Sequence, residues 1–301
     1  MTTAPTTVLV FGAAGQVGRE LVAQAWPDGL AAIGLDRAAA DITDHTVVAR
    51  ALAQHRPALV VNAAAYTAVD KAEQEQARAW AVNRDGAANL AAACAAQDVP
   101  LVHLSTDYVF DGTKSGAYLE DDPVCPLGVY GASKEAGEAA IRAQLARHVI
   151  LRTAWVFGVH GNNFVKTMLR LGAERPELGI VADQRGCPTE AADIARAAAR
   201  IAAAHLSAPS SAQLGTFNYV GAPPTTWHGF AGAIFARAAA GGRRVPALRA
   251  ITTADYPTPA RRPANSVLAP DKLARVYGIA PCDWPAALDR VLGVLAAPAP
   301  A

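Results

Sequence analysis

Short apolar runs alternate with longer, alanine-rich segments along the first half of the chain. Strands that are covered on both faces of a sheet read as continuous apolar runs, so each run predicts a buried strand. The segments between the runs repeat apolar residues at helical spacing. The predicted strands are 6–12, 30–36, 58–65, 100–110 and 149–158, and the predicted helices are about 16–26, 44–55, 72–96 and 129–147.

This alternation is typical of a parallel sheet with helices on both faces. With right-handed crossovers, it predicts an α/β fold with a doubly wound, Rossmann-type parallel sheet. The second half is less regular. There we predict a sixth strand near 177–183 that returns to the sheet, a strand at 215–221 and a helix at about 227–239. The segment 256–266 is too rich in proline for regular structure.

The bulk composition narrows the class of protein. With a formal net charge of +1 over 301 residues, the chain lacks the basic excess of proteins that bind nucleic acid or membrane surfaces. No apolar run approaches the ~20 residues of a membrane span, and the N-terminal sequence carries no export signal. We therefore expect a cytoplasmic protein. The four cysteines are scattered, which argues against a zinc site or a disulfide framework.

A glycine-rich turn follows the first predicted strand. "FGAAGQVGRE" places Gly12, Gly15 and Gly18 where the first predicted helix begins. Such glycines allow a tight turn and let a pyrophosphate approach the backbone, while the free N–H groups of the helix N-terminus attract phosphates. We therefore expect residues 1–160 to form mainly an NAD(P)-binding Rossmann domain. Residues 161–301 would form mainly a smaller, substrate-binding lobe that is interleaved with it.

Other residues at the predicted strand ends would line the cofactor. Asp36 ends the second strand, where an acidic residue bonds the adenosine ribose. Arg37 follows it and could instead meet a 2′-phosphate, so NADH and NADPH both stay open. Ligands of doubly wound sheets lie at the carboxyl ends of the strands. The further candidates are Asp41 and Ile42 beside the adenine, and Ala65, Tyr66 and Thr67 after the third strand.

Candidates for proton transfer follow the fourth predicted strand. Ser105, Thr106 and Asp107 end that strand, and successive side chains alternate between faces, so Ser105 and Thr106 cannot both face one site. Tyr130 and Lys134 are four residues apart on a helix and can share one face. A hydroxyl can orient a carbonyl oxygen, a tyrosine can protonate it, and a lysine charge lowers the tyrosine pKa. This constellation predicts reduction of a carbonyl group by a nicotinamide cofactor.

The chain resembles the extended short-chain dehydrogenase/reductase family, and within it the dTDP-4-dehydrorhamnose reductases. The resemblance is carried, in order along almost the whole chain, by "FGAAGQVG", "VVNAAAYTAVDKAE", "VHLSTDYVFDG", "VYGASKEAGE", "LRTAWVFGVHGNNFVKTMLRL", "DQRGCPT" and "YPTPARRPANS". It implies NADPH- or NADH-dependent reduction of the C4 ketone of a dTDP-sugar, dTDP-4-dehydro-L-rhamnose, in dTDP-rhamnose biosynthesis.

The resemblance also implies roles for single residues. Tyr130 would be the proton donor, Lys134 its partner and a ligand of the nicotinamide ribose, and Thr106 the hydroxyl that orients the substrate. Asp107 and Trp155 would contact the substrate, while Gln16, Val17 and the positions named above would bind the cofactor. Some members use magnesium held by glutamates at a homodimer interface, and Glu20 matches one such position, which leaves a metal requirement open.

Two alternatives remain beside the reductase. One is a nucleotide-sugar epimerase or dehydratase, which would show no net oxidation of NAD(P)H, and the other is a non-catalytic regulatory subunit on the same fold. Several residues also have alternative roles. Asn162 and Asn163 could bond a sugar or cap a helix near Phe164, and Arg261 and Arg262 could meet a diphosphate or lie in a solvated loop. His103 is expected in or near the core.

Overall fold

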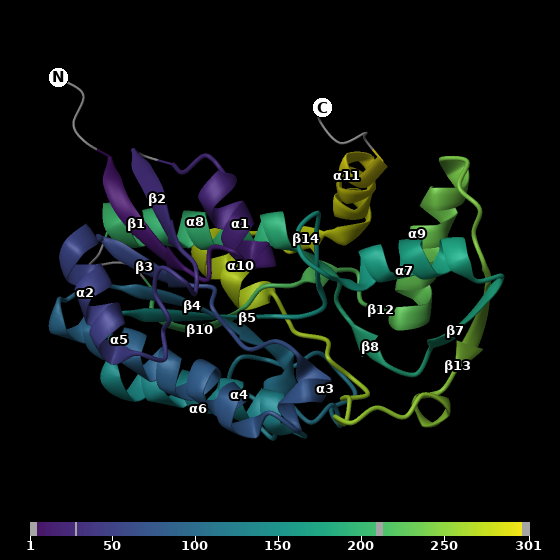
Figure 1. Cartoon of the computed structure of the whole chain (residues 1–301), viewed down its shortest axis with the longest axis horizontal. Coiled ribbons are helices and arrows are strands. Elements are labelled where there is room, and N and C mark those ends of the chain that lie inside the picture. Colours follow the sequence, from purple (N-terminus) through teal and green to yellow (C-terminus); the bar gives the residue numbers. More distant parts are fainter. Residues whose placement is uncertain (1–4, 28, 209–212, 297–301) are drawn as a thin grey trace.

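A six-stranded parallel sheet forms the centre of the molecule. The computed structural model describes residues 5–27, 29–208 and 213–296, and its strands follow the order β10-β5-β4-β3-β1-β2 (Figure 1). All five neighbouring pairs are parallel, which confirms the predicted doubly wound fold. The strands are β1 (Thr6–Phe11), β2 (Leu30–Leu35), β3 (Leu59–Asn62), β4 (Leu101–Thr106), β5 (His148–Thr153) and β10 (Gly215–Asn218).

Helices cover both faces of this sheet. Alternate residues of β1 face opposite sides: Val8 and Val10 pack in one apolar cluster, and Leu9 and Phe11 pack in another. One face is covered by α2 (His45–His55), α5 (Gly86–Ala96) and α6 (Val129–Gln144), and the other by α1 (Gln16–Ala23), α8 (Ala191–Ser207) and α10 (Asp271–Tyr277).

The single helix predicted over 72–96 is wrong. That stretch is broken after α3 (Val69–Ala72) and resumes as α4 (Gln76–Trp80), a π-helix (Ala81–Asp85) and then α5. The break is a tight turn in which the N–H groups of Gln74 and Glu75 both donate to the carbonyl of Lys71. Residues 73–76 are all polar, but they include no glycine or proline that would mark a turn in the sequence.

The predicted strand at 177–183 exists, but its predicted return to the sheet is wrong. It is β7 (Glu177–Val181), and it pairs with β13 (Ala247–Ile251) in a separate two-stranded sheet. β7 alternates between buried and more exposed residues. This pattern suits a sheet with one solvent-exposed face rather than a sheet that is covered on both faces. The sixth place in the central sheet belongs to β10, which pairs with β5.

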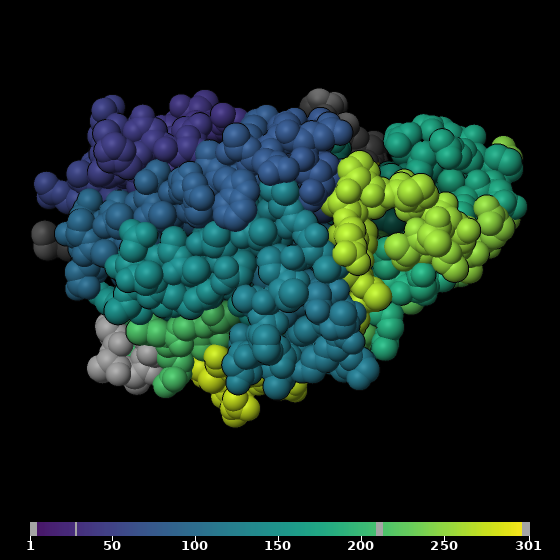
Figure 2. All heavy atoms as spheres, turned by 90° about the horizontal axis from the view of Figure 1, so that it is seen from below, coloured from purple at the N-terminus to yellow at the C-terminus, as the bar shows by residue number. Residues whose placement is uncertain are grey.

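The β7–β13 sheet belongs to a smaller lobe beside the central sheet (Figure 1). Segment 256–266 contains no helix and no named strand, as predicted, and it passes from this lobe back to the larger body beside a hollow in the surface (Figure 2). The remaining elements are α7 (Phe164–Glu174), α9 (Trp227–Ala240), α11 (Trp284–Ala296), β6 (Val156–Phe157), β8 (Arg185–Gly186), β9 (Thr189–Glu190), β11 (Gly221–Ala222), β12 (Thr225–Thr226), β14 (Cys282–Asp283) and the 3-10 turns Asp107–Val109 and Thr253–Asp255.

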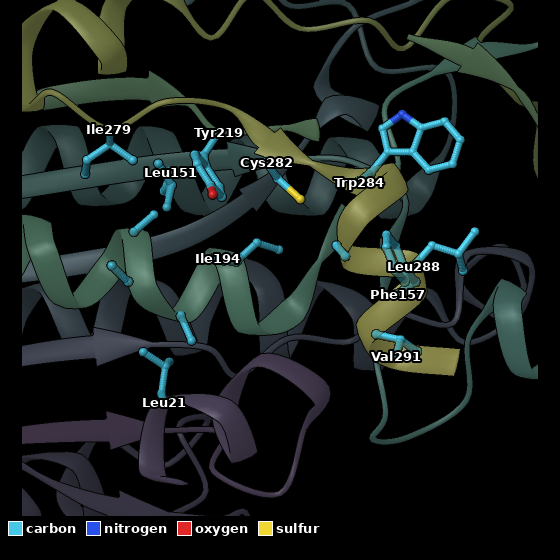
Figure 3. Packing of buried hydrophobic residues seen from close by; sticks show 14 of the residues in the cluster. Leu21, Leu151, Phe157, Ile194, Tyr219, Ile279, Cys282, Trp284, Leu288 and Val291 are labelled. Atoms are coloured by element: carbon cyan, nitrogen blue, oxygen red, sulfur yellow. The ribbon is translucent and has the colours of Figure 1, made fainter. Parts of the chain in front are cut away.

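The main apolar core joins segments from both halves of the chain. Leu151 of β5, Ile194 of α8 and Leu288 of α11 belong to one buried cluster (Figure 3). The second half therefore contributes to the packing of the central sheet as well as to the smaller lobe. No helix among the described residues is long and apolar enough to cross a membrane.

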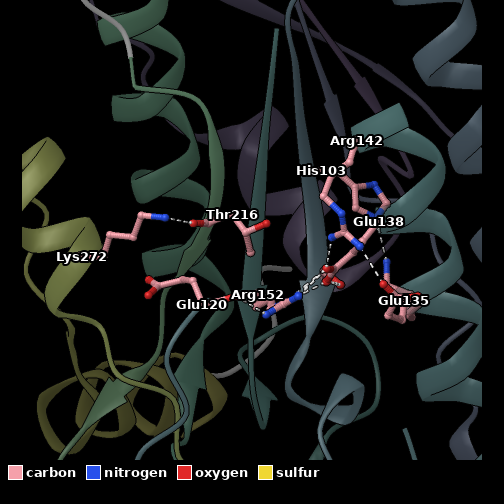
Figure 4. Close-up of polar contacts among 10 residues, drawn as sticks. His103, Glu120, Glu135, Glu138, Arg142, Arg152, Thr216 and Lys272 are labelled. Atoms are coloured by element: carbon pink, nitrogen blue, oxygen red, sulfur yellow. Dashed lines mark hydrogen bonds and ion pairs between the residues drawn. The ribbon is translucent and has the colours of Figure 1, made fainter. Parts of the chain in front are cut away.

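A buried ion pair fastens α6 to β5. Glu138 and Arg152 are 0% and 2% exposed, and the guanidinium makes a contact of 2.7 Å with the carboxylate (Figure 4). Arg142 and the hydroxyl of Ser105 also donate to Glu138. Burial alone would raise the pKa of Glu138, but its bonds with Arg152 hold that pKa below the ordinary value. The carboxylate is thus kept charged inside the protein.

Replacing Arg152 with methionine should destabilise the protein strongly, because Glu138 would keep a buried charge without its main partner. We expect the free energy of unfolding to fall by about 3–5 kcal/mol, measured by urea denaturation. The matched control is Arg170→Met, since Arg170 pairs with Glu174 at the surface of α7 and should contribute less than about 1 kcal/mol. Equal losses in the two variants would contradict a special role for the buried pair.

Candidate active site

The glycine turn has the geometry that a dinucleotide needs. Gly12 has a φ of +82°, and a Cβ on it would lie 2.4 Å from the backbone nitrogen of Ala64. A Cβ on Gly18 would lie 2.1 Å from the carbonyl oxygen of Gly12. Gly15 precedes α1, whose first residues are Gln16 and Val17. The turn therefore leaves backbone N–H groups at a helix N-terminus facing the carboxyl end of the sheet.

A cavity of about 230 Å³ opens beside this turn. It brings together several predicted cofactor residues from three separate segments. The predicted cofactor residues that do not line it are Gln16, Val17, Gly18, Asp36, Thr67, Tyr130 and Lys134. Those predicted residues that do are Gly12, Gly15, Asp41, Ile42, Ala65 and Tyr66, joined by Ala14, Arg37, Ala40, Ala63, Ala64, Arg78 and Val82.

Of the charged residues after β2, Arg37 and Asp41 line the cavity and Asp36 does not. The carboxylate of Asp36 accepts the N–H of Ala39, 2.9 Å away, and so closes its own turn. Arg37 lines the cavity and its guanidinium contacts Asp41 at 3.1 Å. Hydrogen bonds from Thr43 hold the pKa of Asp41 below its ordinary value, so Asp41 stays charged. An exposed arginine that pairs with Asp41 thus lies at the edge of the cavity.

A buried asparagine that the sequence did not single out holds the loop after β3. Asn83 is 1% exposed and lies in the π-helix, a feature often found at functional sites. Its side chain accepts the N–H of Tyr66 at 2.8 Å and donates to the carbonyl of Tyr66 and the hydroxyl of Ser133. Asn83 therefore ties the cofactor side of the cavity to α6. The feature that distinguishes Asn83 is its place in a π-helix, and no signal in the sequence predicts that helix.

Thr106, Asp107 and Tyr130 meet at the carboxyl end of β4. The Thr106 hydroxyl donates to Asp107 at 2.9 Å, and it lies near enough to the phenol of Tyr130 to act against the rise of that pKa. Ser105 faces the other side and donates to Glu138 at 2.5 Å, which confirms that Ser105 and Thr106 do not share one site. Asp107 is 3% exposed, and burial raises its pKa to about 6 although bonds from Ser266 and Thr106 oppose the shift.

Tyr130 and Lys134 lie on the same face of α6, as their spacing predicts. Burial raises the pKa of Tyr130 to about 12, and the nearby Thr106 hydroxyl only partly offsets the rise. This direction is opposite to the lowering that we predicted from Lys134. The physical reason is burial, which disfavours the charged phenolate. Nζ of Lys134 donates to the carbonyl of Leu104 at 2.7 Å and lies 3.2 Å from His103. His103 is therefore in the core, as expected, but also in contact with the lysine.

Two glycines let α6 come close enough to place these groups. A Cβ on Gly131 would lie 2.1 Å from the carbonyl oxygen of Tyr108, and a Cβ on Gly137 would lie 2.1 Å from that of Asn83. Real side chains essentially never approach so near. The helix thus rests directly on the backbone of the segments that follow β4 and precede α5.

Trp155 lies outside the cofactor cavity, after β5. Its ring stacks on that of Trp227, with centroids 3.5 Å apart and planes 8° from parallel, and its backbone has a φ of +48°. A Cβ on Gly186 would lie 2.3 Å from the Trp155 ring. The indole is therefore wedged between the smaller lobe and the end of the sheet, in a strained conformation that the packing maintains.

A second cavity of about 430 Å³ lies between α7, β7 and the segment 256–266. It is lined by apolar side chains and by polar or charged ones, among them Arg262, whose guanidinium contacts Asp70 at 2.8 Å. One nitrogen of that guanidinium, Nη1, is buried without a partner among the described residues. Arg261 is exposed and does not line this cavity. Asn163 caps α7 by accepting the N–H of Lys166, which supports the capping role.

The predicted magnesium position does not form a metal site within this chain. Glu20 lies on α1, and its carboxylate is 3.8 Å from the ring of His160. Within residues 5–27, 29–208 and 213–296, no three His, Cys, Asp or Glu side chains are arranged to hold a metal ion. The residues around Glu20 therefore do not fit magnesium by themselves.

Comparisons with known proteins agree on one family. The family described as "RmlD substrate binding domain" matches residues 6–296. A dTDP-4-dehydrorhamnose reductase from Aggregatibacter actinomycetemcomitans is 45% identical over 287 residues, covering 94% of this chain and 97% of that protein. Two solved structures named as the same enzyme also match. In both cases the match covers 96% of this chain and 99% of the solved chain. The Clostridium acetobutylicum enzyme has a TM-score of 0.88 at 36% identity. The Bacillus anthracis enzyme, in complex with NADP, has a TM-score of 0.89 at 33% identity.

The raised pKa of Asp107 predicts a pH-dependent cost in stability. Its pKa rises from 3.8 to about 6 on folding, so the native state holds the proton more tightly than the unfolded chain, and stability is lost as the pH rises through this window. Replacing Asp107 with asparagine removes this loss. Relative to wild type, the variant should gain up to about 3 kcal/mol in free energy of unfolding between about pH 3 and 7.

Urea denaturation across this pH range checks the prediction. Asp121, which is exposed, supplies the matched control, since Asp121→Asn should differ from wild type by a constant amount. A constant difference for Asp107→Asn as well would show that this carboxyl ionises in the native state as it does in water.

Proposed function

The chain belongs to the dTDP-4-dehydrorhamnose reductase family, and on that basis we propose that it reduces the C4 ketone of dTDP-4-dehydro-L-rhamnose with NADPH or NADH to give dTDP-L-rhamnose. The observation that carries the proposal is the meeting of Thr106, Asp107 and Tyr130 at the carboxyl end of β4, where the Thr106 hydroxyl donates to Asp107 and also influences the phenol. In the strand register, Phe11 stands opposite Asn62 and Asn62 opposite His103. The glycine turn and the proton donor thus lie along one edge of the sheet.

The nucleotide would lie along this edge. We place its pyrophosphate at Gly12, Gly15, Gln16, Val17 and Gly18, because backbone N–H groups and close approach suit phosphate there. Asp36, Asp41 and Ile42 would surround the adenosine, Ala65, Tyr66 and Thr67 would line the middle, and Tyr130 and Lys134 would meet the nicotinamide ribose. The bound nicotinamide would supply hydride to the carbonyl carbon.

The proton chemistry belongs to the chain itself. Thr106 would hold the carbonyl oxygen by a hydrogen bond, and Tyr130 would donate its phenolic proton to the oxygen as negative charge develops there. Lys134, when charged, would stabilise the phenolate that remains. Because burial raises the pKa of Tyr130 to about 12, the phenol is fully protonated at neutral pH. It is therefore ready to act as the acid before each turnover.

The substrate would lie between the sheet edge and the smaller lobe. Asp107 has a carboxylate oxygen, Oδ2, that is buried without a partner among the described residues, and such an oxygen can accept a sugar hydroxyl. Trp155 would close the sugar site, and Arg262 offers its unpartnered nitrogen to a negatively charged diphosphate. That the protein works as a homodimer in the cytoplasm, without nucleic acid or membrane, stays a prediction.

Replacing Tyr130 with phenylalanine should abolish most of the reduction, because the ring keeps its packing but loses the proton. We expect kcat to fall by about 10²–10⁴, measured as the loss of NADPH absorbance with freshly prepared dTDP-4-dehydrorhamnose. Cofactor binding and the urea midpoint serve as controls and should stay close to wild type. Undiminished turnover in this variant would exclude Tyr130 as the acid, while a wild-type chain that oxidises no NADPH would exclude the proposed reduction.

Replacing Arg37 with alanine should weaken NADPH selectively. Arg37 lines the cofactor cavity next to Asp41, where it can reach the 2′-phosphate that NADH lacks. We expect KM for NADPH to rise roughly tenfold and KM for NADH to change little, as measured with both cofactors. Arg50, exposed on α2, gives the control Arg50→Ala. A parallel rise of both KM values would argue against phosphate recognition by Arg37.

A further inference from the structure

Three buried polar side chains form a continuous contact from β3 to the catalytic helix. Asn62, His103 and Lys134 are 1%, 1% and 2% exposed. The amide nitrogen of Asn62 lies 3.0 Å from Nδ1 of His103, and Nε2 of the same ring lies 3.2 Å from Nζ of Lys134. The reaction as described above uses the lysine but gives no role to the other two.

The backbone fixes which end of the Asn62 amide faces the histidine. The N–H of Ala64 points at the other end of that amide, 3.0 Å away. An N–H can only donate, so the atom that it meets must be the carbonyl oxygen, Oδ1. The atom facing His103 is therefore the amide nitrogen, which also can only donate. Nδ1 of His103 must accept, and so carries no proton.

The His103 ring can then carry its proton on only one of its two nitrogens. Burial, together with the nearby charge of Lys134, lowers the pKa of His103 well below its ordinary value, so the ring is neutral and carries one N–H. Since Nδ1 accepts from Asn62, the proton is on Nε2 and faces Nζ of Lys134. A charged ammonium has only donors, so an N–H aimed at it is repulsive. A neutral amine has a lone pair that can accept this N–H.

We propose that Asn62 and His103 are positioning residues that fix the imidazole tautomer so that a donor faces Lys134, which makes the lysine release its proton more readily. The inference rests on the proposed reduction, in which the charge of Lys134 supports Tyr130. It deepens that proposal by naming the groups that set when the charge is present. Neither residue touches the reacting atoms, since each acts through the lysine.

Other charged groups around Lys134 do not account for the same effect. Burial lowers the pKa of Lys134 to about 8, while Glu138, one turn along α6, acts in the opposite direction. Glu138 is itself paired with Arg152 and Arg142. Tyr130, on the preceding turn, is protonated at neutral pH, and His148 acts on His103, whose pKa it helps to lower. His103 is thus the side-chain group in contact with Nζ that disfavours the charge by its orientation.

The reduction should become slower at alkaline pH, where Lys134 loses its charge. Lys134 is charged below a pKa of about 8 and neutral above it. Because the positive charge stabilises the phenolate that forms on Tyr130, kcat/KM for the reduction should fall as the pH rises past this value. The alkaline limb of the pH profile therefore reports on the lysine and, through it, on the histidine tautomer.

Asn62→Asp is the sharpest test. The aspartate has nearly the same shape as the asparagine, but it presents an acceptor instead of a donor to Nδ1 of His103. A carboxylate can accept both the N–H of Ala64 and a proton on Nδ1 of His103. Nε2 would then carry the lone pair and accept from the ammonium, so the alkaline limb should move up by about one pH unit or more. The control compares His103→Leu with the double variant Asn62→Asp and His103→Leu, since both lack the ring. If the aspartate raises the limb as much in this background as in the wild type, the effect is a simple charge effect and the proposal is overturned.

His103→Gln is the second variant, for the case that Asn62→Asp does not fold. A glutamine oxygen can accept from Nζ, so this variant also should move the alkaline limb upward. An unchanged limb in the folded variants overturns the proposal. A wild-type enzyme that oxidises no NADPH overturns instead the proposed reduction, so the two failures are distinguishable.

The tautomer itself can be read without any substrate. In protein with ¹⁵N-labelled imidazole rings, long-range ¹H–¹⁵N correlation spectra distinguish a protonated Nε2 from a protonated Nδ1, and the His103→Gln variant identifies the resonance by its loss. We expect the proton on Nε2 in the wild type and on Nδ1 in Asn62→Asp. A wild-type ring protonated on Nδ1 would refute the proposal at its first step.

Discussion

One face of helix α6 carries three ionisable groups into the interior, and each must find a partner there. Tyr130, Lys134 and Glu138 follow one another at intervals of four residues. The last three residues of β4 meet these groups in turn: Thr106 lies near the Tyr130 phenol, the carbonyl of Leu104 accepts from Lys134, and Ser105 donates to Glu138. Because an unpaired buried polar group is costly, the fold holds the helix and strand in one register. The chemistry of the site depends on that match.

Much of the site could be predicted because its signals are local. The glycines between β1 and α1, the spacing of Tyr130 and Lys134, and the alternation of Ser105 and Thr106 each follow from a few neighbouring residues. The doubly wound sheet follows equally from the regular exchange of strand and helix. These features depend on backbone geometry that any sequence with that spacing would share.

The rest depended on partners distant in the sequence. Arg152 could not be assigned to Glu138, nor Asn83 to Tyr66, because nothing local shows which segments meet. The strand at 177–183 was predicted correctly as a strand, but apolar alternation does not state which neighbour it pairs with. The direction of the Tyr130 pKa shift was wrong for the same reason. Spacing places Lys134 on the correct face, but only the fold shows the burial that raises the pKa of the phenol.

The two glycines of α6 have a practical consequence for engineering. Exchanging a helical glycine for alanine is a standard route to a more stable protein, since glycine in a helix costs about 1 kcal/mol. Here the added methyl groups would meet carbonyl oxygens at 2.1 Å and lift the helix away from β4. Thermostabilisation by this rule would displace the phenol and the amine together. In this chain, Gly131 and Gly137 should be excluded from any such design.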